Sequence, residues 1–170
     1  MFDLVPQIDF SNAGPLLRQT WQVMSPLPGG KYLFSKLLGL INPYTGSMNA
    51  RFIELAPGYA KVQLREHRAI HNHLNSIHAV ALINLAEVTS GLSLLMGLPR
   101  DMRGIPVHLS IDYHKKSRGL ITCECRCTPP ATSQRQEFDL TCTLKNEAGQ
   151  LVADARAKWI IGPKGARREN

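Results

Sequence analysis

The 170-residue sequence has no apolar run that approaches the ~18 consecutive residues needed to span a membrane. Its first residues, Met1 to Pro6, also lack a basic segment followed by an apolar one, so no secretory signal peptide is expected. We therefore expect a cytoplasmic protein that does not associate with membranes. Charged residues make up only 19% of the chain and hydrophobic residues 44%, which is enough apolar material for a folded core.

Cysteines are few, and none is spaced as Cys-x-x-Cys. Cys123, Cys125 and Cys127 alternate with other residues, which on a strand directs all three to one face. Together with Cys142 they are interpreted as reduced, apolar-like residues of a sheet, with a thiol-rich metal or redox site as the alternative. The central histidines also lack the spacing of a zinc site: His67, His71, His73 and His78. We expect no metal and no cofactor.

Acidic residues are outnumbered by basic ones, which gives a formal net charge of +7. Such a charge attracts nucleic acid, but it attracts a phosphorylated small molecule equally well. Part of the excess lies in residues 164–168, which we expect to be frayed. The other basic residues are scattered and form no recognised nucleic-acid motif, so no nucleic-acid partner is expected.

Helical patterns occupy the N-terminal part of the chain. One begins at Pro15, after the capping residues Ser11 and Asn12, and a second extends from Tyr32 until Asn42-Pro43 ends it. We expect these helices to form an extension over residues 1–46, followed by a main domain over 47–162 and a basic tail over 163–170.

Strand patterns, with a period of two, dominate the main domain. Two strands flank Pro57-Gly58 as a hairpin and four follow later in the chain, at 48–52, 59–65, 105–113, 120–128, 138–144 and 151–161. Between the hairpin and the last four strands, residues 78–97 are apolar at nearly every position, which predicts a helix buried on all sides. This order predicts an α+β fold in which an antiparallel sheet wraps around the helix.

Glu87 is the only charged residue between His78 and Arg100, in the middle of this apolar helix. An unpaired buried carboxylate is costly, so it must be paired, be protonated or face a cavity. No lysine or arginine lies three or four residues away to pair with it. Burial should raise its pKa, which suits a general base or a carboxylate nucleophile.

The start of the same helix is a second candidate site. The first N–H groups of a helix have no internal partner, and they can stabilise an oxyanion that forms on a carbonyl. His78 and the amide of Ala79 are the natural donors. Glu87 lies about 13 Å further along the axis and half a turn around it. The two sites can act on one carbonyl if two chains pair by a two-fold axis, which predicts a homodimer with composite sites. A dimer of dimers is left open.

The stretch from Asn72 to Val80, continued by Asn84-Leu85-Ala86-Glu87, resembles the signature of hotdog-fold thioesterases of the phenylacetate-degradation type. That family shows Asn, a nearby Gly, His-Gly-Gly and an acidic residue nine positions after the His. The resemblance covers roughly residues 47–162 and implies a hotdog fold. It further implies that Glu87 is the catalytic carboxylate, that Asn72 positions the substrate, and that His78 and Ala79 form the oxyanion hole.

The sequence departs from this pattern at three places. Asn75 stands where the family has Gly, Ala79-Val80 replaces Gly-Gly, and Pro106 stands where some relatives carry Ser or Thr. Alanine keeps its N–H, so the oxyanion hole can survive. These departures are typical of a less characterised branch of the family.

A basic turn between two predicted strands is expected to bind the phosphates of coenzyme A, as the resemblance implies. The alternative is that the turn is a hairpin tip exposed to solvent. The candidate substrate-binding residues are Asn75, Asn84, Ser90, Lys115, Lys116 and Arg118. The function expected from the resemblance is acyl-CoA thioester hydrolysis. A module that binds acyl-CoA without turnover is the main alternative, and a hydratase on the same fold ranks lower.

Overall fold

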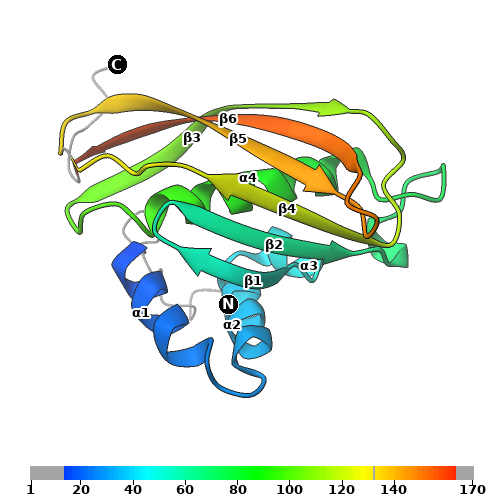
Figure 1. Ribbon diagram of the computed structural model, residues 1–170, viewed down its shortest axis with the longest axis horizontal. Coiled ribbons are helices and arrows are strands. Elements are labelled where there is room, and N and C mark those ends of the chain that lie inside the picture. Colours follow the sequence, from blue (N-terminus) through cyan, green and yellow to red (C-terminus); the bar gives the residue numbers. More distant parts are fainter. Residues whose placement is uncertain (1–13, 132, 164–170) are drawn as a thin grey trace, which may run out of the picture.

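A six-stranded antiparallel sheet curves around one long helix in the computed structural model, which describes residues 14–131 and 133–163 (Figure 1). The helices are α1 (Gly14–Met24), α2 (Gly30–Ile41), α3 (Pro43–Ser47) and α4 (Ala79–Leu95). The strands are β1 (Arg51–Ala56), β2 (Tyr59–Arg65), β3 (Met102–Tyr113), β4 (Leu120–Arg126), β5 (Gln136–Lys145) and β6 (Leu151–Pro163). A 3-10 turn at Arg68–Ile70 precedes α4.

The order of strands across the sheet is β1-β2-β4-β5-β6-β3, so β1 and β3 are its edges. The predicted hairpin is confirmed, and its turn places Gly58 at φ 80°, a conformation that glycine adopts without steric cost. Strand β3 pairs with β6 from Met102 to Tyr113, with a bulge between Pro106 and His108. A proline is tolerated there because an edge strand or a bulge does not require its missing N–H.

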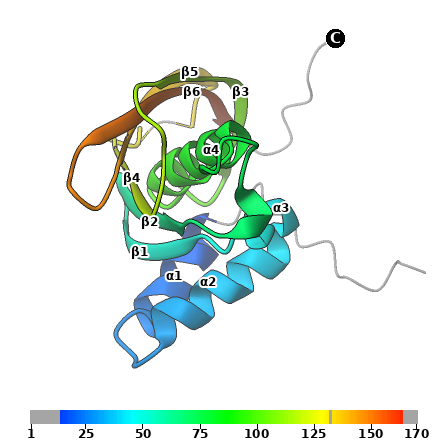
Figure 2. The same ribbon diagram turned by 90° about the vertical axis from the view of Figure 1, so that its right-hand side faces the viewer.

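Helix α4 is largely buried, as predicted, but one stripe of it stays partly open. Figure 2 shows α4 nearly end-on, with the sheet curving from β1 below it to β3 above it. The side facing the sheet is fully buried at residues such as Leu85 and Leu94. Val80 is 49% exposed, and Glu87 and Val88 are half-buried. Glu87 therefore lies on the one side of the helix that the sheet does not cover.

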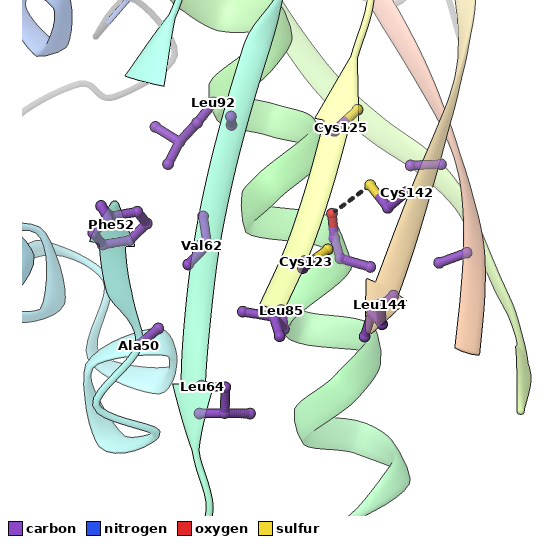
Figure 3. Close-up of a cluster of buried hydrophobic side chains, with 14 of the residues drawn as sticks. Ala50, Phe52, Val62, Leu64, Leu85, Leu92, Cys123, Cys125, Cys142 and Leu144 are labelled. Carbon is purple, nitrogen blue, oxygen red and sulfur yellow. Dashed lines mark hydrogen bonds between the residues drawn. The ribbon is translucent and has the colours of Figure 1, made fainter. Parts of the chain in front are cut away.

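The cysteines pack between the sheet and α4 (Figure 3). Cys123 and Cys125 are buried on one face of β4, and Cys142 lies opposite Cys125 on β5. The Cys142 thiol donates to the carbonyl oxygen of Ala86 at 3.4 Å. Hydrogen bonds with Cys123 and Cys125, together with burial, raise the pKa of the Cys142 thiol. All four thiols are free, in agreement with their interpretation as reduced core residues.

The N-terminal helices share the core of the sheet domain. Trp21 of α1 packs edge-on against Phe34 of α2 with 5.1 Å between ring centroids, and Phe34 packs in the same way against Phe52 of β1 at 5.9 Å. Gly14, the first residue of α1, lies so close to α4 that a β-carbon there would come within 2.1 Å of the Leu95 carbonyl oxygen. The extension is thereby fixed against both β1 and the end of α4.

The architecture confirms the predicted α+β hotdog fold with N-terminal helices. Several details differ from the prediction: α3 was missed, the first strand begins at Arg51 rather than at residue 48, and the third begins at Met102. Most of the predicted tail, from residue 164, lies outside the described residues, as do Ser11 and Asn12. Within the described part of the chain, no helix is long and apolar enough to cross a membrane.

Candidate active site

Glu87 faces a cleft of about 300 Å³ that lies between α4 and the N-terminal helices. The sequence left three options for this carboxylate, and the structure places it at a cavity. No ion pair to it occurs among the described residues. Burial raises the pKa of the Glu87 carboxyl above its ordinary value of 4.5, and the hydrogen bond from Asn84 partly opposes that rise.

Asn84 holds this carboxylate and is itself held by the N-terminal extension. Its Nδ2 donates to Glu87 Oε2 at 3.2 Å, and its Oδ1 accepts a hydrogen bond from Thr45 Oγ1 at 3.1 Å. Thr45 is buried in α3. Because Thr45 occupies the amide oxygen of Asn84, the amide nitrogen is directed toward Glu87. The side chain of Asn84 therefore positions Glu87.

Ser90 lies one turn further along α4 and is fully buried. Its Oγ donates to the Glu87 carbonyl oxygen at 2.9 Å and accepts from Trp159 Nε1 at 3.3 Å. The ring of Trp159 rests on Gly91, where a β-carbon would come within 2.9 Å of it. Ser90 thus orients the indole that lines the Glu87 cleft, and its own hydroxyl group is already engaged within the chain.

The start of α4 is capped by a ring nitrogen. His78 is the N-cap residue, and its Nδ1 accepts the N–H of Val80 at 3.2 Å. The N–H of Ala79 has no acceptor among the described residues, and Ala79 is exposed. The Tyr113 hydroxyl donates to the Ala79 carbonyl oxygen at 3.0 Å, which fixes this first peptide to β3. One open helix N–H therefore remains at the position predicted for an oxyanion donor.

Asn72 organises the loop that leads into the helix. Its Oδ1 accepts hydrogen bonds from the N–H groups of Leu74 and Ser76 and from the Ser76 hydroxyl, at 2.9 to 3.2 Å. Asn75 adopts φ 51°, in the left-handed region. Asparagine is among the few residues that adopt this conformation readily, which explains why it can replace the glycine of the resembling family.

A second pocket, of about 310 Å³, joins this loop to the basic turn after β3. Asn72, Ala79, Lys115 and Lys116 all line it, so four predicted site residues that are distant in sequence are brought together. Both lysine side chains are exposed. Arg118 lies beside the same loop, with Nη2 at 3.5 Å from the Leu74 carbonyl oxygen.

The single chain does not bring Glu87 and Ala79 to one place. Glu87 lines the cleft beside the N-terminal helices, whereas Ala79 lines the pocket of the basic turn. His78 faces a third depression together with Tyr44 and His71. With about 12 Å between them along α4, the carboxylate and the open N–H lie in different pockets of one subunit.

Two other histidines of the central group, His67 and His71, are engaged separately. His67 Nε2 lies 3.1 Å from the Met48 carbonyl oxygen, and His71 Nε2 lies 2.9 Å from Glu66 Oε1. The described part of the chain holds no cluster of three or more His, Cys, Asp or Glu side chains arranged to bind a metal ion.

Two site residues were missed by sequence reasoning, Thr45 and Trp159. Both act on α4 from elements far away in the chain, through Asn84 and Ser90. Nothing in the local sequence indicates these contacts. The exception is a weak signal at Trp159, a large aromatic residue in a strand pattern that otherwise holds small and aliphatic apolar residues.

Comparison with known families matches residues 30–161 to DUF4442, described as a domain of unknown function. The match spans most of the chain, which therefore belongs to this family. No match is found among curated proteins.

Solved structures with the same fold include a structural-genomics target, APC5556, which is 24% identical with a TM-score of 0.76 and covers 87% of this chain and 99% of its own. A Pseudomonas aeruginosa protein, PA5026, described as of unknown function and as a probable thioesterase, is 21% identical with a TM-score of 0.66. The match covers 81% of this chain and 97% of PA5026. The Haemophilus influenzae thioesterase HI1161 is 10% identical with a TM-score of 0.64. The match covers 75% of this chain and 87% of HI1161. At these identities the likeness establishes the fold.

Proposed function

We propose that this member of the DUF4442 family hydrolyses acyl-CoA thioesters, with Glu87 as the general base and the N–H of Ala79 as the oxyanion donor. The observation that carries the proposal is the half-buried, unpaired carboxylate of Glu87 at a cleft, on the same helix as an open N-terminal N–H. Thioesterases with this fold occur among the similar solved structures, which supports the choice of reaction.

The reaction uses the groups as follows. Glu87 takes a proton from a water molecule, which attacks the thioester carbonyl carbon, and the oxyanion that forms accepts a hydrogen bond from Ala79 N–H. The carbon–sulfur bond then breaks, and the proton passes from Glu87 to the departing thiolate. The products are a carboxylic acid and the free thiol of coenzyme A. Lys115 and Lys116 bind its phosphates. Direct attack by the carboxylate is the alternative route.

The separation of the two groups in one chain favours a homodimer with composite sites. Strand β3 is a long edge of the sheet, and Ile105 and Val107 on it are 39% and 41% exposed. Such an edge is a template for pairing with a second chain. Two-fold pairing of β3 with β3 of a second copy would place the open stripes of the two α4 helices side by side, so that Glu87 of one chain meets Ala79 of the other.

A binding module without turnover is the second candidate, and one observation favours it. The N–H of Val80, which could have been a second oxyanion donor, is already occupied by the ring of His78. The site then offers a single backbone donor, which weakens the stabilisation of an oxyanion.

The test is thiol release from short, long and aromatic acyl-CoAs by the wild type, Glu87→Gln and the matched control Glu147→Gln, a surface carboxylate 61% exposed. We expect Glu87→Gln to lose about a thousandfold or more in kcat and Glu147→Gln to match the wild type. Because the pKa of Glu87 is raised, its ionised form disfavours the folded state at neutral pH, so the melting temperature of Glu87→Gln should equal or exceed that of the wild type. A folded Glu87→Gln variant with full activity contradicts the proposal, and binding without turnover by the wild type supports the second candidate.

A further inference from the structure

The cleft beside Glu87 is bounded on one side by the N-terminal extension and on the other by α4 and β6. Leu17 of α1 together with Leu38 and Ile41 of α2 form the outer wall. The inner wall follows one face of α4, at residues 87, 88, 91, 92 and 95, with Trp159 beside it. The hotdog domain alone would leave this side of α4 open.

The lining is apolar except at Glu87 and Asn42. Glu87 is the only charged residue among the residues that line the cleft. The single polar atom of Trp159, Nε1, is already bonded to Ser90. The ring therefore presents only its apolar surface. Asn42 also lines the cleft, and its Oδ1 accepts the N–H of Thr45 at 3.5 Å. The other lining side chains are apolar, so most of the cleft fits a hydrocarbon chain.

The size of the cleft limits the length of such a chain. A water-sized group occupies about 30 Å³, so a cleft of about 300 Å³ holds roughly ten groups of that size. From Glu87 to Leu95 the inner wall extends about 12 Å along α4. Both measures correspond to a medium-length chain that extends from the catalytic carboxylate toward the end of the helix.

We infer that the N-terminal extension forms the acyl-binding wall of the site and restricts the substrate to medium-chain acyl groups, of about eight to ten carbons. The inference rests on the proposed thioester hydrolysis and adds the substrate class and the residues that determine it. Ile41 is the most suitable of these residues for a mutational test. It lines the cleft and is 39% exposed, so a substitution there should have little effect on core packing.

The test measures kcat/KM for saturated acyl-CoAs from acetyl-CoA to palmitoyl-CoA in four proteins: wild type, Ile41→Trp, Ile41→Ala and the control Leu40→Trp. Leu40 is the neighbouring residue on α2, is 77% exposed and does not line this cleft. For the wild type we expect about a fourfold rise per methylene until the cleft is full, from the transfer free energy of a buried CH₂. Ile41→Trp should lower kcat/KM for decanoyl-CoA at least tenfold more than kcat/KM for acetyl-CoA. Ile41→Ala should move the optimum to longer chains, and Leu40→Trp should follow the wild type.

Two results overturn the inference while leaving hydrolysis intact. One is a wild-type kcat/KM that does not depend on chain length. The other is an Ile41→Trp variant in which kcat/KM falls by the same factor for every chain length. If no acyl-CoA releases thiol, the proposed hydrolysis fails, and calorimetric dissociation constants for the same series decide the inference separately. A length-dependent affinity that Ile41→Trp alone removes then supports the acyl wall. Equal affinity for all lengths, or no binding, overturns it.

Discussion

The two pockets along α4 differ in every chemical respect. The pocket at the start of the helix is open and basic, with two exposed lysines and the N–H of Ala79, which has no acceptor in the part of the chain that the structure describes. The cleft beside Glu87 is lined mainly by leucine, isoleucine, valine and tryptophan, with Asn42 and one half-buried carboxylate as its polar groups. The first pocket can bind phosphates and stabilise a developing negative charge. The second can bind a hydrocarbon chain, and its carboxylate can accept a proton.

This division shows how one helix can serve two parts of a large, mixed ligand. Coenzyme A is polyanionic at one end, and its acyl group is apolar at the other. Because Ala79 and Glu87 line different pockets of one chain, the proposed reaction requires a second chain to bring both groups to one thioester. This arrangement predicts complementation between chains. A chain with a mutation in one pocket should regain activity in a dimer with a chain in which that pocket is intact.

The largest effect in the basic pocket is expected from Ala79→Pro, which removes the open N–H. Proline is tolerated at the first position of a helix, and His78 has φ −64° and ψ 140°, the backbone conformation favoured before proline. The helix should therefore persist. Loss of one oxyanion donor should lower kcat about a hundredfold to a thousandfold. Ala79→Ser keeps the N–H and is the control. Equal activity of the proline and serine variants would exclude this N–H from catalysis.

Refolding the Glu87→Gln and Ala79→Pro variants together tests whether each site takes its carboxylate and its N–H donor from different chains. Glu87→Gln and Ala79→Pro are each expected to be nearly inactive, but a mixed dimer holds one site with an intact Glu87 and an intact Ala79. After unfolding and refolding together in equal amounts, we expect about a quarter of wild-type activity, because half of the dimers are mixed and each has one working site. Activity no higher than that of the separate variants would place both groups within one chain.

A smaller effect is expected from the double change Lys115→Ala and Lys116→Ala. Removal of two charge-assisted contacts to phosphate should raise KM for an acyl-CoA about tenfold with little change in kcat. The corresponding acyl-pantetheine lacks the nucleotide phosphates and should be unaffected. High salt should reduce the difference between wild type and variant. An equal effect on both substrates would show that the lysines act on the loop rather than on the phosphates.

Sequence reasoning reached the local features of these pockets. Glu87 stood out because a charge within an apolar helix is costly wherever it lies, and the start of α4 was marked by the change from polar loop to apolar helix. The two-strand, helix, four-strand order also determined the fold, since a long apolar helix requires a sheet to cover it. The signals at Glu87 and at the start of α4, and each element of this order, lie within a continuous stretch of sequence.

The remaining features depend on contacts between distant segments. The bond from Thr45 to Asn84 joins residues 39 positions apart, and that from Trp159 to Ser90 joins residues 69 positions apart. The apolar residues of α1 and α2 fit an ordinary amphipathic pattern, so only their packing shows that some of them line the Glu87 cleft. Helix α3 was hidden because Asn42-Pro43 ends one helix and also begins the next, with proline in the first turn.

The smallest predicted effect concerns this hidden contact between the extension and Glu87. Thr45→Val removes the hydrogen bond to Asn84 Oδ1, so the amide is no longer held with its nitrogen toward Glu87. Because that N–H stabilises the ionised carboxylate and lowers its pKa, its loss should raise the pKa further above 4.5. A base must be ionised to act, so the acidic limb of the pH profile of kcat/KM should move to higher pH, by up to about one unit. Thr45→Ser keeps the hydroxyl group and should leave the limb in place. A variant with lower activity at every pH but an unmoved limb would assign Thr45 to packing alone, because packing does not change the charge state of a carboxylate.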